Sequence, residues 1–168
     1  MGIPATVSAS GAVAKAQRYE GDLSLTAMPR LAQLVRPEAH AVQVQLVADD
    51  KSGYPRMHGE VSGTLPLECQ RCGRAFDWPL QAAIDLRLVR DEQHEHDLLG
   101  DCDPYLVRDD QLPLRELIED EVLLALPMLA RCESCENSVN AAPAAVQEGP
   151  AVRRENPFAA LKDKLKHS

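Results

Sequence analysis

The sequence predicts an α+β fold in which an antiparallel sheet, open or curled towards a barrel, packs against one amphipathic helix. Apolar and polar residues alternate over residues 57–67 and again over 76–88. This period of two is typical of half-buried strands, because successive side chains point to opposite faces. Residues 114–125 instead carry apolar side chains at helical spacing. Hydrophobic residues make up 45% of the chain and aromatic residues only 4%, so we expect a core of Leu, Val, Ile and Ala.

The N-terminal third gives weaker signals than the rest of the chain. Residues 1–20 are rich in Ala, Ser and Gly without a clear period, and we expect a partly disordered segment that precedes a single domain over 21–136. Residues 22–35 fit a short helix with an apolar face of Leu31, Leu34 and Val35, and Pro37 would stop it. Residues 42–46 alternate between apolar residues and glutamine, which predicts a strand.

The two long alternating segments predict a hairpin with a cysteine knuckle at its tip. Cys69, Cys72 and Gly73 lie between the segments, and glycine allows the positive φ that a tight metal-binding turn commonly needs. Residues 91–103 are acidic and include His94 and His96. These histidines could ligate a metal, but a mobile solvated loop is the favoured interpretation.

The predicted helix over 112–126 ends near Pro127. Its polar side includes the consecutive acids Glu119, Asp120 and Glu121. Paired catalytic carboxylates are one interpretation of these acids. Three consecutive helix positions do not face one another, so a solvated face is the better interpretation.

Two Cys-x-x-Cys pairs predict a metal site: Cys69 with Cys72, and Cys132 with Cys135. The two-residue gap lets both sulfurs of a pair bind one tetrahedral ion, and four thiolates would complete a closed, structural zinc site. Four free thiols are the plain alternative. A redox pair is a third interpretation, but a thioredoxin-like pair should open a helix after a strand, and neither pair has that context. Cys102 lies in the acidic segment, and we expect it to take no part.

The end of the chain predicts a tethered interaction segment. Residues 137–155 have the Ala, Pro, Val and Gly composition of a flexible linker, and residues 156–168 fit a short helix. Phe158 and Leu161 would line its apolar face, and Lys162 belongs to a basic run towards its end. Such a helix is too short to be stable alone in water, so we expect its apolar face to contact a partner.

The charge of the chain limits the kinds of partner it can bind. Asp and Glu number 26 against 18 Lys and Arg, a net charge of −8, which excludes the whole surface as an electrostatic clamp for nucleic acid. Arg71, Arg74 and Arg131 flank the cysteine pairs and would converge if the metal site forms. They would then make a small positive cap suited to a phosphate backbone, although solubility alone also explains them.

Other function classes find little support in the sequence. The chain lacks a recognisable signal peptide, and its longest apolar run is far shorter than the ~20 residues of a membrane helix. We therefore expect a soluble cytoplasmic protein, with cysteines reduced or metal-bound and not in disulfides. Because no Ser/His/Asp or Cys/His set stands out, we expect neither an enzyme nor a small-molecule substrate.

Three motifs occur in a fixed order along the chain: LECQRCGRAF over 67–76, LIEDEVLLALP over 117–127 and NPFAAL over 156–161. Together they resemble the bacterial YceD family of large ribosomal RNA subunit accumulation proteins. Family members often place a histidine and a single cysteine after the Leu-Pro segment, whereas residues 130–135 here hold two cysteines and no histidine.

The resemblance implies a non-enzymatic accessory factor in the synthesis, processing or stability of the large-subunit (23S) ribosomal RNA. Such a factor would act by binding RNA, a ribosomal protein or an assembly partner. The alternatives are a purely protein-binding adaptor without RNA contact, which the acidic composition favours, and a thiol-disulfide redox protein.

Overall fold

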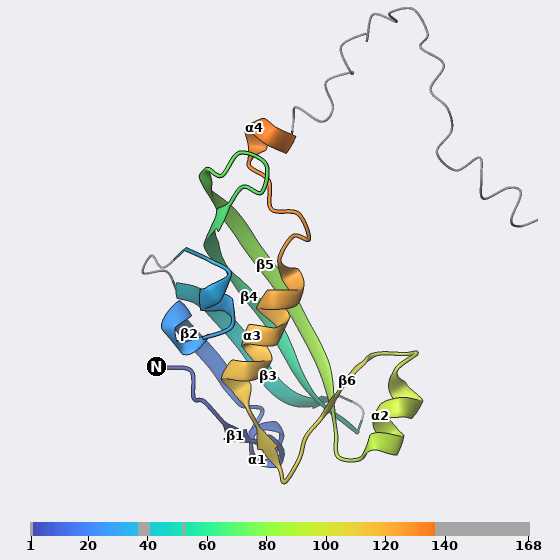
Figure 1. Cartoon of the computed structure of the whole chain (residues 1–168). Helices are drawn as coiled ribbons and strands as arrows, with labels where there is room; N and C mark the ends of the chain where they lie inside the picture. The colour runs from blue at the N-terminus through green and yellow to red at the C-terminus, as the bar shows by residue number, and fades with distance from the viewer. Residues whose placement is uncertain (1, 37–40, 52, 137–168) are drawn as a thin grey trace, which may run out of the picture. The chain divides into compact units, whose positions relative to one another are not determined.

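A five-stranded sheet forms the centre of the computed structural model, which describes residues 2–36, 41–51 and 53–136 (Figure 1). The strands lie in sequence order as β2 (Arg18–Ser24), β3 (Ala41–Lys51), β4 (Tyr54–Glu68), β5 (Ala75–Val89) and β6 (Asp103–Leu106). The predicted α+β class is confirmed. The sheet is open, however, because β2 and β6 remain at its two edges, and the interpretation as a barrel is wrong. It is also mixed, since β6 pairs with β5 in parallel after a crossover.

The long β4–β5 hairpin confirms the alternation seen in the sequence. The two strands pair from Arg56 opposite Arg87 up to Glu68 opposite Ala75. Gly59 on β4 lies close to the β3 backbone: its φ is 146°, and a Cβ there would clash with the carbonyl oxygen of Gln45. This position therefore requires glycine, and it allows two twisted strands to pack together.

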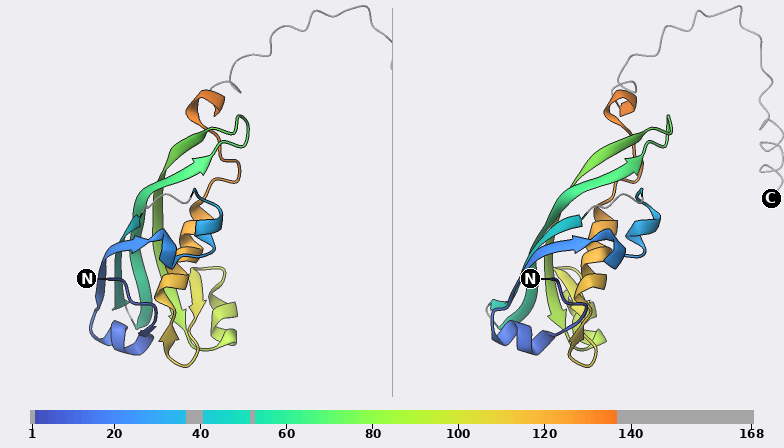
Figure 2. Two further views of the ribbon diagram at one scale, coloured as in Figure 1. Left: turned by 60° about the vertical axis from the view of Figure 1, so that its left-hand side comes forward. Right: turned by 90° about the vertical axis from the view of Figure 1, so that its left-hand side faces the viewer.

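The helix α3 (Leu114–Ala125) covers one face of the sheet and confirms the prediction for this segment (Figure 2). Leu114, Leu117, Ile118 and Val122 are buried against the apolar sides of the strands. The interpretation of the acidic run as a solvated face is wrong for Glu119, which is 3% exposed. Its carboxylate accepts hydrogen bonds from the Arg30 and Leu31 backbone N–H groups at 2.6 and 2.9 Å.

The N-terminal residues form elements that their composition did not predict. β1 (Val7–Ser8) pairs with β7 (Gln111–Leu112), and α1 (Ala9–Ala14) packs on β3. The carboxylate of Asp110 holds this corner, because it accepts hydrogen bonds from the hydroxyls of Ser8 and Ser10 at 2.6 and 2.7 Å. These hydrogen bonds join residues about a hundred positions apart, so no local sequence pattern reveals them.

The helix predicted over residues 22–35 is wrong. β2 runs to Ser24, and two short 3-10 turns follow, η1 (Leu25–Ala27) and η2 (Leu31–Gln33). Pro29 separates the two turns, since proline lacks the N–H that a continuous helix needs. Leu25, Met28, Leu31 and Val35 are nevertheless all buried, and their spacing imitates a helical face.

The loop predicted over residues 91–103 is also wrong, because the helix α2 (Glu92–Leu98) forms there. The Asp91 side chain accepts a hydrogen bond from the His94 N–H at 2.7 Å and caps the helix. Glu92 and Glu95 then lie in the first turn, where the helix dipole favours negative charge. Asp91 followed by Glu92 and Glu95 is the sequence signal from which this helix could have been predicted.

The predicted linker over 137–155 and the predicted helix over 156–168, with Phe158, Leu161 and Lys162, lie outside the described residues. Within residues 2–36, 41–51 and 53–136, no helix has both the length and the apolar character needed to cross a membrane.

Candidate metal centre

The tip of the β4–β5 hairpin brings together four cysteines from two distant segments. Cys69 and Cys72 lie in the turn between the strands, and Cys132 and Cys135 lie at the short helix α4 (Glu133–Glu136). Figure 1 shows α4 beside this tip. The four Sγ atoms all lie within 4.8 Å of one another, and the cysteines form no disulfide. The predicted grouping of the two pairs is therefore confirmed.

The backbone of the hairpin turn shapes the first half of the site. The Cys69 N–H donates to the Arg74 carbonyl at 2.9 Å, and the Gly73 N–H donates to the Cys69 carbonyl at 2.8 Å. Gly73 has a φ of 70°, in the left-handed region where a side chain would be strained. Glycine at this position lets the turn curl tightly enough for both sulfurs to point the same way.

The second half of the site is fastened to the first by the backbone. The Gln70 N–H donates to the Ala130 carbonyl at 2.9 Å, which fixes the approach to Cys132. The N–H groups of Cys135 and Glu136 both donate to the Cys132 carbonyl, at 2.9 and 3.0 Å. The segment after α3 is thus anchored to the hairpin tip independently of the sulfurs.

The donor set fits one tetrahedral metal ion. Zn–S bonds of about 2.3 Å in a tetrahedron place sulfurs about 3.8 Å apart. The Cys72 and Cys132 Sγ atoms are 3.8 Å apart. Cys69, Cys132 and Cys135 are 1%, 8% and 9% exposed, whereas Cys72 is exposed, so the cluster is buried on three sides and open to solvent at Cys72. Four thiolates would fill the coordination shell, and such a closed site is structural in character.

Hydrogen bonds and burial shift the pKa values of three of the thiols in opposite directions. The Cys132 backbone N–H is the main cause that lowers the pKa of Cys69 to about 6, and the Ser134 hydroxyl lowers the pKa of Cys132. Burial, together with the neighbouring thiols, raises the pKa of Cys135 to about 12. Four thiolates within 4.8 Å of one another would need a compensating cation.

Two of the three predicted arginines contact residues of the cysteine pairs, and the third lies next to Cys132 in the sequence. Arg74 donates from Nη2 to the Ser134 hydroxyl at 2.8 Å, and its Nε lies 3.5 Å from the Cys72 sulfur. Arg71 donates to the Cys135 carbonyl at 3.3 Å. Arg131 lies 4.0 Å from the Glu136 carboxylate. These three arginines therefore lie near the cysteines, one of them beside an acidic side chain, and their role as a binding surface stays a prediction.

The sequence did not identify Ser134 as part of the site. Its hydroxyl lies 3.2 Å from the Cys132 sulfur and also accepts the hydrogen bond from Arg74. Its position in the sequence, between Cys132 and Cys135, is the feature from which its proximity to the sulfurs could have been predicted. Cys102 lies outside the group of four, and its thiol is 3.8 Å from the Leu98 carbonyl.

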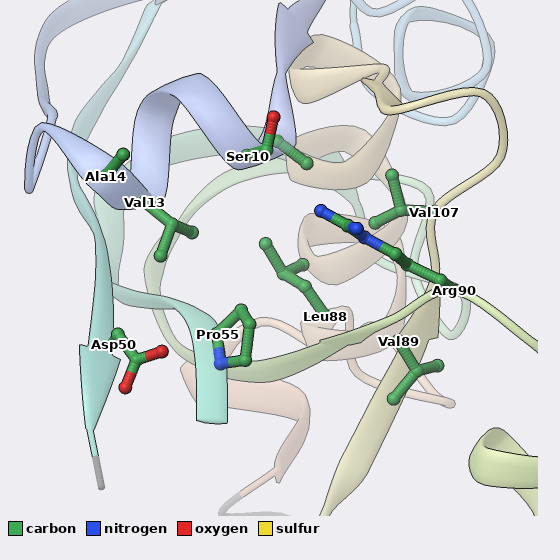
Figure 3. Close-up of a pocket in the computed structure, with 10 residues that line it drawn as sticks. Ser10, Val13, Ala14, Asp50, Pro55, Leu88, Val89, Arg90 and Val107 are labelled. Carbon is green, nitrogen blue, oxygen red and sulfur yellow. The ribbon is translucent and has the colours of Figure 1, made fainter. Parts of the chain in front are cut away.

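A separate pocket lies at α1 and the ends of β3 to β5 (Figure 3). It encloses about 440 Å³ and brings together none of the predicted site residues. Val13, Pro55 and Leu88 make its lining largely apolar. The Asp50 carboxylate accepts a hydrogen bond from the Gly53 N–H at 2.7 Å, and Arg90 lies 4.0 Å from Asp110. The charged groups of the pocket therefore already have partners within the fold.

Comparisons with known proteins agree with the motif analysis. The family model described as "Large ribosomal RNA subunit accumulation protein YceD" matches residues 57–166. The protein of that name from Haemophilus influenzae is 28% identical over 163 residues, which are 95% of this chain and 94% of the relative.

The Bacillus subtilis protein YlbN, described as uncharacterized, is 32% identical over 108 residues, which are 64% of this chain. The match spans only 59% of the length of YlbN. No solved structure matches the chain significantly.

Proposed function

The chain belongs to the YceD family, and we propose that it is a cytoplasmic, non-enzymatic accessory factor in the accumulation of large-subunit ribosomal RNA. In this proposal it binds precursor RNA through a zinc-stabilised tip. The observation that carries the proposal is the convergence of four sulfurs and three arginines at one end of a chain whose net charge is −8.

Zinc is the proposed ion because four thiolates at tetrahedral spacing are a common zinc environment. When bound, it would supply charge compensation and a rigid link between the two segments, with no open position for catalysis. The protein's own groups then do the binding. Arg71 and Arg74 are held against Cys135 and Ser134, so they need little further ordering to meet a phosphate backbone. The clustering of all four sulfurs also favours coordination over a two-cysteine redox pair.

The test is in-cell ultraviolet crosslinking of the tagged full chain, followed by sequencing of the attached RNA. We expect enrichment of one region of the large-subunit precursor RNA. Replacing Arg71, Arg74 and Arg131 with Gln should reduce the recovered RNA by about tenfold, because each lost phosphate contact weakens binding.

The matched control replaces Arg90 and Arg108 with Gln. Their side chains are 76% and 77% exposed and lie outside the tip. If this control lowers RNA recovery as much as the tip variant, the arginines at the cysteines have no special role.

A protein-binding adaptor without RNA contact is the second candidate, and the net charge of −8 is the observation that favours it. The same experiment separates the two. Recovery of background RNA alone, from a tagged protein that still supports growth, would overturn the RNA-binding proposal and leave the adaptor.

A further inference from the structure

Three large apolar side chains are exposed in the last turn of α3 and in the segment that leads from it to the cysteine cluster. Leu124 is 79% exposed, Met128 is 97% exposed and Leu129 is 60% exposed. We call these three residues the exit patch. Single exposed leucines are common on monomeric proteins, whereas a group of large exposed apolar side chains is typical of an interaction site.

The segment that carries the exit patch is held at both ends. The Leu126 N–H donates to the Leu123 carbonyl at 3.3 Å, and the Gln70 N–H donates to the Ala130 carbonyl at 2.9 Å. Ala125, Leu126 and Ala130 also pack against the main core. The three side chains therefore lie on an anchored segment. Little conformational entropy of this segment would be lost when a partner binds.

The surface of α3 that leads to the exit patch is acidic. Glu116, Asp120 and Leu124 follow one another at a spacing of four, so they share one stripe of the helix. Asp120 pairs with Arg30 at 2.6 Å, whereas Glu116 and Glu121 form no ion pair within the described ranges. Burial, with Asp103 and Asp120 nearby, raises the pKa of Glu121. Acidic side chains on the described α3 therefore outnumber their ion-pair partners, since Arg30 pairs with both Glu119 and Asp120.

We propose that the exit patch and the acidic stripe of α3 bind a lysine- and arginine-rich protein segment that carries a few large apolar side chains. The apolar side chains would cover Leu124, Met128 and Leu129, and the basic ones would face Glu116 and Glu121. RNA does not fit this surface, because carboxylates repel phosphate. A second copy does not fit either, because three side chains fall short of the roughly 800 Å² per partner that stable dimers bury, and acidic stripes would meet.

This inference rests on the proposed function, since it assigns that accessory factor a basic protein partner beside its RNA. The proteins of the large ribosomal subunit are the probe, because they are basic enough to bind RNA. In the full chain, Met128 is replaced by the photocrosslinking residue benzoylphenylalanine. The variant is irradiated with the purified protein mixture stripped from large ribosomal subunits, and crosslinked peptides are identified by mass spectrometry.

We expect crosslinks to one or a few segments rich in Lys and Arg. Their yield should exceed by about fivefold that from the same residue placed at Leu99, which is 63% exposed on the α2 side of the fold. When Leu124→Glu is combined with the photocrosslinking residue at Met128, the crosslink yield should fall about tenfold, because apolar burial is lost. Adding Glu116→Lys should lower it about threefold through lost charge attraction, whereas Glu60→Lys on β4 should not.

Three results would overturn the inference: equal yields from Met128 and Leu99, crosslinks to segments without excess Lys and Arg, or crosslinks that reach only a second copy or residues 137–168 of the same chain. Failure here is distinguishable from failure of the proposed function. The RNA crosslinks depend on Arg71, Arg74 and Arg131, and the protein crosslinks depend on Leu124 and Glu116. The melting temperature of each variant shows whether it still folds.

Discussion

At the root of the β4–β5 hairpin, Met57 pairs with Leu86 and Val61 pairs with Ala82, all buried within one large apolar core. At the tip of the same hairpin, Phe76 is the one apolar side chain of the described residues that packs against the cluster of Cys69, Cys132 and Cys135. The root contains enough apolar side chains to be stable by burial alone. The tip contains too few apolar side chains for this. We infer that metal coordination by the cysteines stabilises the tip instead. Loss of apolar burial should therefore destabilise the root, and loss of a cysteine ligand should destabilise the tip.

The largest effect should come from the core under α3. Ile118 is fully buried, and Ile118→Ala should lower the free energy of unfolding by about 2–5 kcal/mol, through lost burial and the cavity left behind. Urea unfolding measures this change. Leu124→Ala, on the same helix but 79% exposed, is the matched control and should change it by less than about 0.5 kcal/mol. Similar losses from both variants would contradict the assigned core.

A smaller loss is expected from the buried carboxylate on the same helix. Glu119→Ala leaves the Arg30 and Leu31 N–H groups without their acceptor, which should cost about 2–3 kcal/mol of unfolding free energy. Glu116→Ala, on the exposed side of α3, serves as the control. If the urea-unfolding midpoint of Glu119→Ala equals that of the wild type, these hydrogen bonds contribute nothing to the stability of the fold.

Disrupting the tip should leave the root largely intact. Cys72→Ser should abolish the proposed zinc binding and speed amide hydrogen exchange at residues 69–74 by at least about tenfold. Amides near Met57 and Val61 should change by less than about tenfold, equal to about 1.4 kcal/mol. Cys102→Ser is the control for loss of a thiol outside the cluster. If exchange rises equally at the root and the tip, the two ends are one cooperative unit and the comparison fails.

The smallest effect should come from the solvent-facing side of the sheet. The hydrogen bond from Arg56, at 2.6 Å, is the main cause that lowers the pKa of Asp49. A carboxyl whose pKa is lowered by folding adds stability above its ordinary pKa and loses it as the pH falls through the lower folded value. Wild-type stability should therefore fall more steeply than that of Asp49→Asn below about pH 4. Glu60→Gln is the control, and identical acid profiles for wild type and Asp49→Asn would contradict the assignment.

The elements that were predicted correctly have a regular hydrophobic period over a long segment. The β4–β5 hairpin and α3 bury one side chain in two, or one face of a helix, and the sequence reveals such burial directly. The wrongly predicted segments depend on single contacts. Pro29 breaks what looked like a helix, and the Asp91 cap makes a helix of what looked like a loop.

The candidate site likewise contains features that local spacing predicts and features that depend on distant contacts. The spacing of Cys69 with Cys72, and of Cys132 with Cys135, predicted their meeting because ligand spacing is a local property. Ser134 and the hydrogen bond from Gln70 to Ala130 depend on how two distant segments approach each other. The burial of Glu119 likewise depends on η2, which lies far from α3 in sequence. No local period carries that information.

The central claim is that a zinc ion held by all four cysteines stabilises the tip. Elemental analysis of the full chain, purified without chelator or added metal, tests it most directly. We expect close to one zinc per chain in the wild type and in Cys102→Ser, and a large loss of zinc in Cys72→Ser. A wild-type protein without zinc, or a Cys72→Ser protein with undiminished zinc, would contradict the claim.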